Sequence, residues 1–193
     1  MAGHAHYTAV LDACVLYPIA CTDALISIAA EGIYAAKWTR QIENEWMAAL
    51  ERNRPDLVGR MEKRRDAMRR AVLDWEITEE AWRSVTTMPV LPDVDDAHVL
   101  AAAIVGHADC IVTRNHRDFP QGLLDPLHIQ VIDPDVFIVN QWDLEQLSVI
   151  AAFRSVRANR KKPAQTPMQF ADSFEAAGLP LTAARLRKVL DLL

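Results

Sequence analysis

The sequence contains no apolar run long enough to cross a membrane. Its longest uninterrupted apolar stretch, residues 99–105, is far shorter than the ~20 residues that a transmembrane helix needs. The opening MAGHAHYTAVLD also lacks a basic segment followed by an apolar one, which is the pattern of a secretory signal. We therefore expect no membrane segment and a cytoplasmic location.

Cysteine is scarce, and its positions suggest neither a disulfide framework nor a zinc site. Cys14, Cys21 and Cys110 are odd in number, lie in apolar surroundings and lack the spacing of metal ligands. We expect buried free thiols in a reducing compartment.

Positive charge is in deficit over the whole chain. The formal net charge is −5, which argues against a protein that coats nucleic acid non-specifically. Two segments depart from this balance: residues 52–70 contain eight Lys or Arg against three acids, and residues 154–162 contain five and no acid. Such segments are usually solvated helix faces. Beside an acidic pocket they would instead favour a polyanion that approaches bound cations.

The apolar pattern alternates between the periods of strands and helices. It predicts strands near residues 7–12, 34–38, 108–113 and 128–132, and helices near 22–32, 39–53, 56–73, 79–85 and 96–107. Strand–helix–strand alternation with short connections predicts an α/β fold, with a parallel β-sheet sandwiched by helices.

The last third of the chain has a different pattern, which is helical only. It predicts a helix over 142–158, a basic linker over 159–167, and a pair of helices broken at Gly178–Pro180. We therefore expect an α/β domain over residues 7–138 and a C-terminal helical extension over 140–193. Because every acid considered below precedes residue 119, the extension is expected to be separable from the chemistry.

Carboxylates are concentrated where the strands of such a sheet end. Asp12 ends the first strand, Asp96 opens the helix that leads into the third strand, and Asn115 and Asp118 follow that strand after Thr113. The functional crevice of an open parallel sheet lies beyond the carboxyl ends of its strands. Carboxylates that converge there repel one another unless a cation neutralises them. A site built only from oxygen ligands favours Mg²⁺ or Mn²⁺.

Each of these acids also has a simpler interpretation. Asp12 by itself could be a turn residue, Asp95 or Asp96 could cap a helix, and Asp118 could cap the turn ahead of Phe119. If Asp96 binds metal, Asp93 and Asp95 are expected to cap the helix or to hold water.

A further acid, Glu45, lies in the middle of the predicted helix over residues 39–53. That helix begins just after the second strand and can lean over the same edge of the sheet. A solvated helix face is the simpler interpretation of Glu45, and Glu43 is a competing candidate for the site.

Four segments together resemble the motifs of the PIN-domain ribonuclease family, and especially of its VapC-type toxin branch. They are LDACVLYP, TRQIENEW with Glu45, DDAHVLAAA and ADCIVTRNHRDF, and the resemblance covers residues 7–138. It implies Asp12, Glu45, Asp96 and Asn115 as catalytic residues, with the hydroxyl of Thr113 beside them. We expect metal ligands at Asp12, Glu45, Asp96 and Asp118. We expect contacts with those ligands or with the substrate from Asp93, Thr113, Arg114 and His116.

The resemblance also implies an activity and partners. The expected function is that of a metal-dependent endoribonuclease that uses Mg²⁺ or Mn²⁺, acts on RNA, and serves as the toxin of a type II toxin–antitoxin pair. A cognate antitoxin protein is the implied partner. A homodimer is expected through apolar helix surface near the first helix and the helix over 56–73.

Two other interpretations compete with an active nuclease. A PIN scaffold that binds RNA or a protein without efficient cleavage is favoured by the uncharged Asn115 at the fourth position. A phosphatase of the haloacid-dehalogenase type also begins with an aspartate after its first strand. It requires a second acid two residues later, where this chain has Cys14, and we discount it on that ground.

Overall fold

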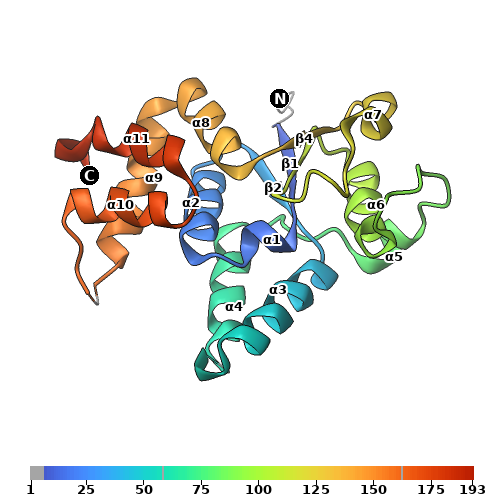
Figure 1. Cartoon of the computed structure of the whole chain (residues 1–193), viewed down its shortest axis with the longest axis horizontal. Coiled ribbons are helices and arrows are strands. Elements are labelled where there is room, and N and C mark those ends of the chain that lie inside the picture. Colours follow the sequence, from blue (N-terminus) through green and yellow to red (C-terminus); the bar gives the residue numbers. More distant parts are fainter. Residues whose placement is uncertain (1–6, 58, 162) are drawn as a thin grey trace.

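A computed structural model of the chain describes residues 7–57, 59–161 and 163–193 (Figure 1). Its centre is a sheet of four parallel strands in the order β2–β1–β3–β4. The strands are β1 (Thr8–Leu11), β2 (Ala35–Lys37), β3 (Cys110–Val112) and β4 (Gln130–Ile132). β1 is central, with Ala9 opposite both Ala36 of β2 and Cys110 of β3. The predicted parallel α/β fold is confirmed.

Helices cover both faces of this sheet. α2 (Ile19–Ala30) connects β1 to β2, whereas α6 (Ala97–Val105) leads into β3 on the other side of β1. Right-handed crossovers in opposite directions put these two helices on opposite faces. Figure 1 accordingly shows α2 and α6 on either side of the strands. The strand order reverses between β1 and β3, so the carboxyl ends of these two strands border the crevice of the sheet.

The first two thirds of the chain contain further helices. They are α1 (Ala13–Leu16), α3 (Arg40–Asn53), α4 (Met61–Ala71), α5 (Glu79–Arg83) and α7 (Gln121–Leu124). α3 begins where predicted, because the Thr39 side chain accepts a hydrogen bond from the Ile42 amide at 3.1 Å, and such a cap contributes about 1 kcal/mol. Its buried side chains include Ile42, Trp46 and Leu50, four residues apart, which turns one face of α3 toward the core.

Two predicted helices differ from the structure. The helix expected over 56–73 is a 3₁₀ turn, η1 (Pro55–Leu57), followed by α4 from Met61, and residue 58 lies outside the described part. The helix expected over 142–158 is two helices, α8 (Pro134–Leu144) and α9 (Gln146–Asn159). They are divided at Glu145, whose backbone (φ −137°, ψ 62°) is not helical. Asp133 caps α8 by accepting from the Asp135 amide at 2.8 Å.

The C-terminal helices share one hydrophobic core with the sheet. α9, α10 (Pro167–Ala176) and α11 (Pro180–Arg187) lie beside α2 and α8 (Figure 1). Phe153, Phe170 and Phe174 are buried in mutual edge-on contact, and they belong to the same buried cluster as the strands. The division expected at residues 138–140 falls inside α8, so a cut after Val139 would divide that helix and remove α9, which packs against α2.

Specific polar contacts also fasten this extension. The Asp135 carboxylate on α8 accepts hydrogen bonds from the Leu181 amide and from the amide and hydroxyl of Thr182, at 2.7 to 2.8 Å. Arg160 pairs with Asp23 of α2 at 3.0 Å. The packing of α8, α9 and α10 on α2 accounts for the apolar character of that helix within a single chain, and the homodimer stays a prediction. Among the described residues, no helix has both the length and the apolar character that crossing a bilayer requires.

Candidate active site at the carboxyl edge of the sheet

Asp12 lies in the crevice directly after β1. Its amide continues the ladder by donating to the Val112 carbonyl at 3.2 Å, which brings the ends of β1 and β3 together. Its carboxylate is only 5% exposed. The Thr113 hydroxyl donates to Asp12 Oδ2 at 2.7 Å, and the Cys14 thiol donates to the same oxygen at 3.0 Å. Asp12 is therefore a buried carboxylate oriented by two uncharged donors.

Asp93 and Asp96 come from the turn that opens α6. A 3₁₀ turn, η2 (Val94–Asp96), precedes the helix, and Asp93 caps it by accepting from the Asp95 amide at 2.9 Å. Asp96 makes no capping hydrogen bond. Asp93 therefore caps this turn, in place of Asp95 or Asp96. The Asp96 carboxylate is not used as a cap and can bind a ligand in the crevice.

Asn115 and Asp118 come from the loop after β3. The Asn115 amide N–H donates to the Thr113 hydroxyl at 2.9 Å, which turns the loop toward Asp12. The side-chain Nδ2 of Asn115 donates to Asp118 Oδ2 and, at 3.4 Å, to Asp96 Oδ2. Asn115 therefore joins two acids through its amide nitrogen.

Carboxylates gather here without a strong base to compensate them. One oxygen each from Asp93, Asp96 and Asp118 lies within 4.8 Å of the other two. Burial, followed by the charges of Asp12, Asp93 and Asp118, raises the pKa of Asp96 from 3.8 to about 6. In the described part of the chain, no ion pair involves Asp12, Asp96 or Asp118. A bound cation would offset the repulsion between these carboxylates and would lower the pKa of Asp96.

The spacing of these oxygens is wider than that around a bound ion. Mg²⁺ binds oxygen at about 2.1 Å in an octahedron, so its neighbouring ligands are about 3.0 Å apart and opposite ones about 4.2 Å. Oxygens within 4.8 Å of one another would therefore have to move closer together to share such an ion. Asp12 is not a member of this group of three, although its charge acts on Asp96.

Glu45 is connected to the site through His98. The Glu45 Oε1 atom lies 2.8 Å from His98 Nε2, and Gln41 Nε2 donates to the same oxygen at 3.2 Å. His98 follows Asp96 by two residues, is buried, and packs against Trp82 with ring centroids 5.9 Å apart. Its Nδ1 has no hydrogen-bond partner in the described structure. His98 is therefore a packed imidazole that also contacts Glu45.

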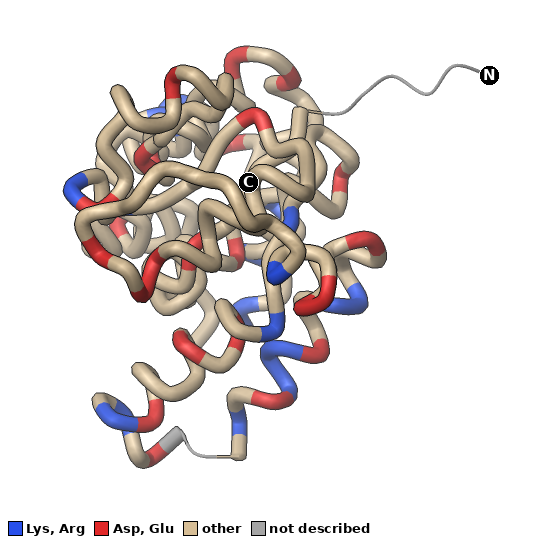
Figure 2. The backbone as a smooth tube through the Cα atoms, turned by 90° about the vertical axis from the view of Figure 1, so that its right-hand side faces the viewer, with Lys and Arg blue, Asp and Glu red and all other residues tan. Residues whose placement is uncertain are grey.

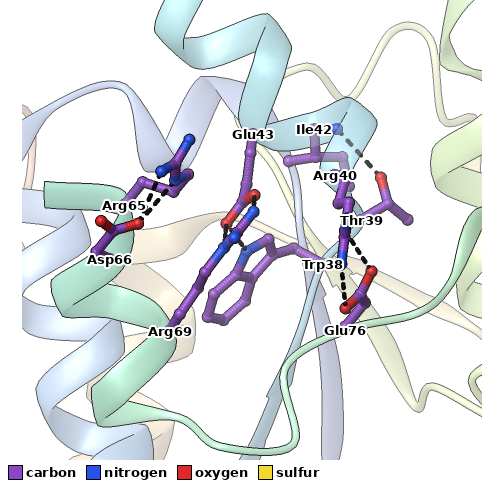
Figure 3. A network of polar contacts seen from close by, with 9 residues as sticks. All are labelled: Trp38, Thr39, Arg40, Ile42, Glu43, Arg65, Asp66, Arg69 and Glu76. Carbon is purple, nitrogen blue, oxygen red and sulfur yellow. Dashed lines mark hydrogen bonds and ion pairs between the residues drawn. The ribbon is translucent and has the colours of Figure 1, made fainter. Parts of the chain in front are cut away.

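The competing acid on the same helix, Glu43, points elsewhere. It is 1% exposed and accepts hydrogen bonds at Oε1 from Trp38 Nε1 and Arg69 Nε, both at 3.0 Å, while Arg69 Nη2 binds Oε2 (Figure 3). The Arg69 guanidinium also lies over the Trp75 ring at 4.7 Å. Both oxygens of Glu43 are thus occupied, so it joins α3 to α4 and lies outside the acidic site.

Each acid proposed as a ligand keeps one oxygen without a hydrogen bond. The bonds just described reach only Oδ2 of Asp12, Asp96 and Asp118 and only Oε1 of Glu45. Within the described residues their other oxygens have no donor. This is the arrangement that a metal ligand requires, with one oxygen fixed by the protein and one left for the ion.

The other residues expected near the site lie as follows. Arg114 donates from Nη2 to the Ala177 carbonyl at 2.8 Å, so its side chain extends toward α10. His116 is exposed. Cys14, which was expected to be buried, is half-buried and contacts both Asp12 and Thr113, and burial raises the pKa of its thiol to about 12. Its place two residues after Asp12 was a signal for a contact of this kind.

Comparisons with known proteins agree with the predicted fold. A family model described as PIN domain matches residues 8–117, and one described as VapC50 C-terminal domain matches residues 134–188. A protein of Mycobacterium tuberculosis (strain H37Rv) named "Putative ribonuclease VapC50" is 34% identical over 94 residues, which are 49% of this chain and 55% of that relative. The chain thus spans about half the length of the curated relative it matches. No solved structure matches it.

Proposed function

Since the chain belongs to the PIN-domain family, we propose that it is a metal-dependent endoribonuclease that hydrolyses phosphodiester bonds in single-stranded or looped RNA. The observation that carries this proposal is the group of uncompensated carboxylates at the carboxyl edge of the sheet. The proposed metal ligands are Asp12, Glu45, Asp96 and Asp118, of which Asp96 and Asp118 belong to that group, and Mg²⁺ or Mn²⁺ is the proposed ion. Unpaired RNA suits the crevice because its backbone can bend into a narrow site.

The side chains around the ion would divide the work. When bound, a divalent ion supplies Lewis acidity, which activates water and neutralises negative charge on the reacting phosphate. Thr113 and Cys14 hold Asp12 in one orientation by donating to Oδ2, and His98 and Gln41 do the same for Glu45 at Oε1. Asn115 keeps Asp118 and Asp96 together. No side chain bonds covalently to the substrate.

We also propose that the chain is the toxin of a type II toxin–antitoxin pair in the cytoplasm, inhibited by a small cognate protein. This rests on the VapC name of the matched relative and of the family model over residues 134–188. The division into a nuclease domain over 7–138 and an extension over 140–193 is likewise proposed, as a division of roles within one hydrophobic core.

The direct test is cleavage of a labelled RNA pool by the full chain. Internal cuts are expected with Mg²⁺ or Mn²⁺, and a chelator should abolish them. RNA that is bound but left intact with either ion would instead favour the PIN scaffold. A thermal melt provides a second measurement, because an ion that binds only the native site raises the melting temperature by mass action.

A further inference from the structure

A groove leaves the acidic site along α3. Its first part, of about 470 Å³, is lined at one end by Cys14 and Glu45 and farther on by Ala49 and Arg52. A second cavity of about 490 Å³ is lined by Leu50, Arg54, Arg60 and Met61, among others. Tyr17 lines both cavities, so they adjoin at its side chain and are together called the groove; Glu45 is the proposed ligand that lines it.

The charge along this path changes sign. Glu45, Ala49 and Arg52 follow one another at helical spacing on one face of α3. Seven residues at 1.5 Å each place Arg52 about 10 Å along the helix from Glu45. Figure 2 shows basic and acidic residues interleaved at the lower end of the molecule, where α3 and α4 lie in Figure 1. The groove is acidic only where it meets the site.

Most arginines of the segment 52–70 are committed to the fold. Arg54 pairs with Asp56 at 2.9 Å. Arg64 is largely buried, donates to the Leu16 and Tyr17 carbonyls, and lies over the Trp46 ring. Arg69 holds Glu43.

Two arginines on the groove have no such role. Arg52 and Arg60 are exposed, and neither side chain makes a hydrogen bond or ion pair with another described residue. These two cations are therefore available to a ligand in the groove.

The second basic segment, residues 154–162, is occupied differently. Arg157 donates to the Gln165 and Leu193 carbonyls, and Arg160 binds Asp23 and Ser173 and lies over Phe170. Lys162 lies outside the described residues. Arg157 and Arg160 therefore hold the C-terminal helices in place. The groove is the better candidate for the basic surface that contacts a polyanion.

We infer that this groove is the subsite for the unpaired nucleotides next to the scissile phosphate, with Tyr17 against a base and with Arg52 and Arg60 on backbone phosphates. The inference rests on the proposed function and deepens it. A single RNA strand carries the same charge throughout, so it suits cations in the groove and an ion-filled site at its end. Tyr17 is half-buried, with its hydroxyl accepting from Asn53 at 3.3 Å, and aromatic rings of this kind stack unpaired bases.

The experiment measures the affinity of the full chain for a labelled unpaired oligoribonucleotide with Mn²⁺, in an Asp12→Asn background that suppresses cleavage. Arg52→Ala and Arg60→Ala should each weaken binding several-fold and reduce the slope of log affinity against log salt by about 0.7. Tyr17→Ala should weaken binding about fivefold or more with an unchanged salt slope, and Tyr17→Phe should restore the affinity. Arg154→Ala, an exposed arginine on α9, is the matched control.

The outcomes separate this subsite from the proposed function. If the wild-type chain shows no metal-dependent cleavage, the proposed function and the subsite both fail. If it cleaves RNA but the groove variants bind like Arg154→Ala, only the subsite is overturned. Groove variants that keep their RNA affinity and escape inhibition by a cognate protein would overturn it too, by assigning the groove to that protein. A homodimer that buries Ile19 and Met61 of the second cavity would likewise overturn it, by assigning this surface to a second copy of the chain.

Discussion

Two carboxylate groups two residues apart on α3 differ in what surrounds them. Glu43 is buried beside Arg69 and Trp38, with both oxygens occupied (Figure 3). Glu45 points toward the crevice, where His98 and Gln41 reach only one of its oxygens. Asp12, Asp96 and Asp118 come from other elements and, like Glu45, each keep one oxygen without a hydrogen bond in the described structure. The charges of Asp12 and Asp118 raise the pKa of Asp96.

The difference shows how a structural acid can be told from a candidate ligand. A buried charge is tolerated when a partner charge and hydrogen bonds compensate it. Arg69 compensates the charge of Glu43 within the chain. The carboxylates of Asp93, Asp96 and Asp118 are compensated only when a cation is bound. Substitutions should therefore have opposite consequences in the two places.

The largest expected effect is on catalysis. Asp12→Asn and Asp96→Asn should each reduce RNA cleavage by at least about a hundredfold, because each removes a charge that holds the ion. Both variants should unfold at or above the wild-type temperature without metal, since neutralisation relieves repulsion. Mn²⁺ should raise the melting temperature of the wild type more than that of either variant. Wild-type cleavage by either variant would remove that residue from the site.

The next effect is on stability. Glu43→Gln leaves Arg69 beside an uncharged amide, and we expect a loss of about 2 kcal/mol. This is less than the 3–5 kcal/mol typical of a fully buried pair, because the Arg69 side chain is 30% exposed. Denaturant unfolding measures it. Glu45→Gln is the matched control on the same helix, with stability nearly unchanged and cleavage reduced. Equal stability of the two variants would contradict the contrast drawn between these acids.

A smaller effect should appear as pH dependence. The pKa of Asp96 in the folded, metal-free chain is about 6, above its ordinary value of 3.8. The folded state therefore holds this proton more tightly than the unfolded state, and metal-free stability should fall as pH rises from about 4 to 6. Below pH 6 the proton competes with Mn²⁺, so affinity should drop by up to about tenfold per pH unit. Calorimetric Mn²⁺ titrations and melts across this range measure both trends, and Asp96→Asn should flatten them.

The smallest expected effect concerns the fourth position. Asp118→Asn should raise the Mn²⁺ concentration for half-maximal cleavage several-fold, and adding Asn115→Asp should restore it by returning a carboxylate to the same loop. Metal titrations on the wild type, the single variants and the double variant decide the point. An Asp118→Asn curve that overlays the wild-type curve would leave Asn115 as the fourth ligand.

Much of this arrangement could be predicted from the sequence. The positions of Asp12, Asp96 and Asn115 relative to the strands were sufficient, because parallel strands bring their carboxyl ends to one edge. The sequence did not decide between Glu43 and Glu45, because that choice depends on Arg69, which lies 26 residues from Glu43 in the sequence. The helix break at Glu145 and the contact between His98 and Glu45 were likewise beyond local patterns, because tertiary packing determines both.

The contact of Arg114 with the end of α10 constrains how related chains can vary. Arg114 donates to the carbonyls of Ala177 and Gly178, and a Cβ on Gly178, which has φ +75°, would lie 2.7 Å from Arg114 Nη1. The arginine and the glycine should therefore be inherited together. In relatives that lack the helical extension, the residue at the position of Arg114 has no such carbonyl partners, and its type should vary freely.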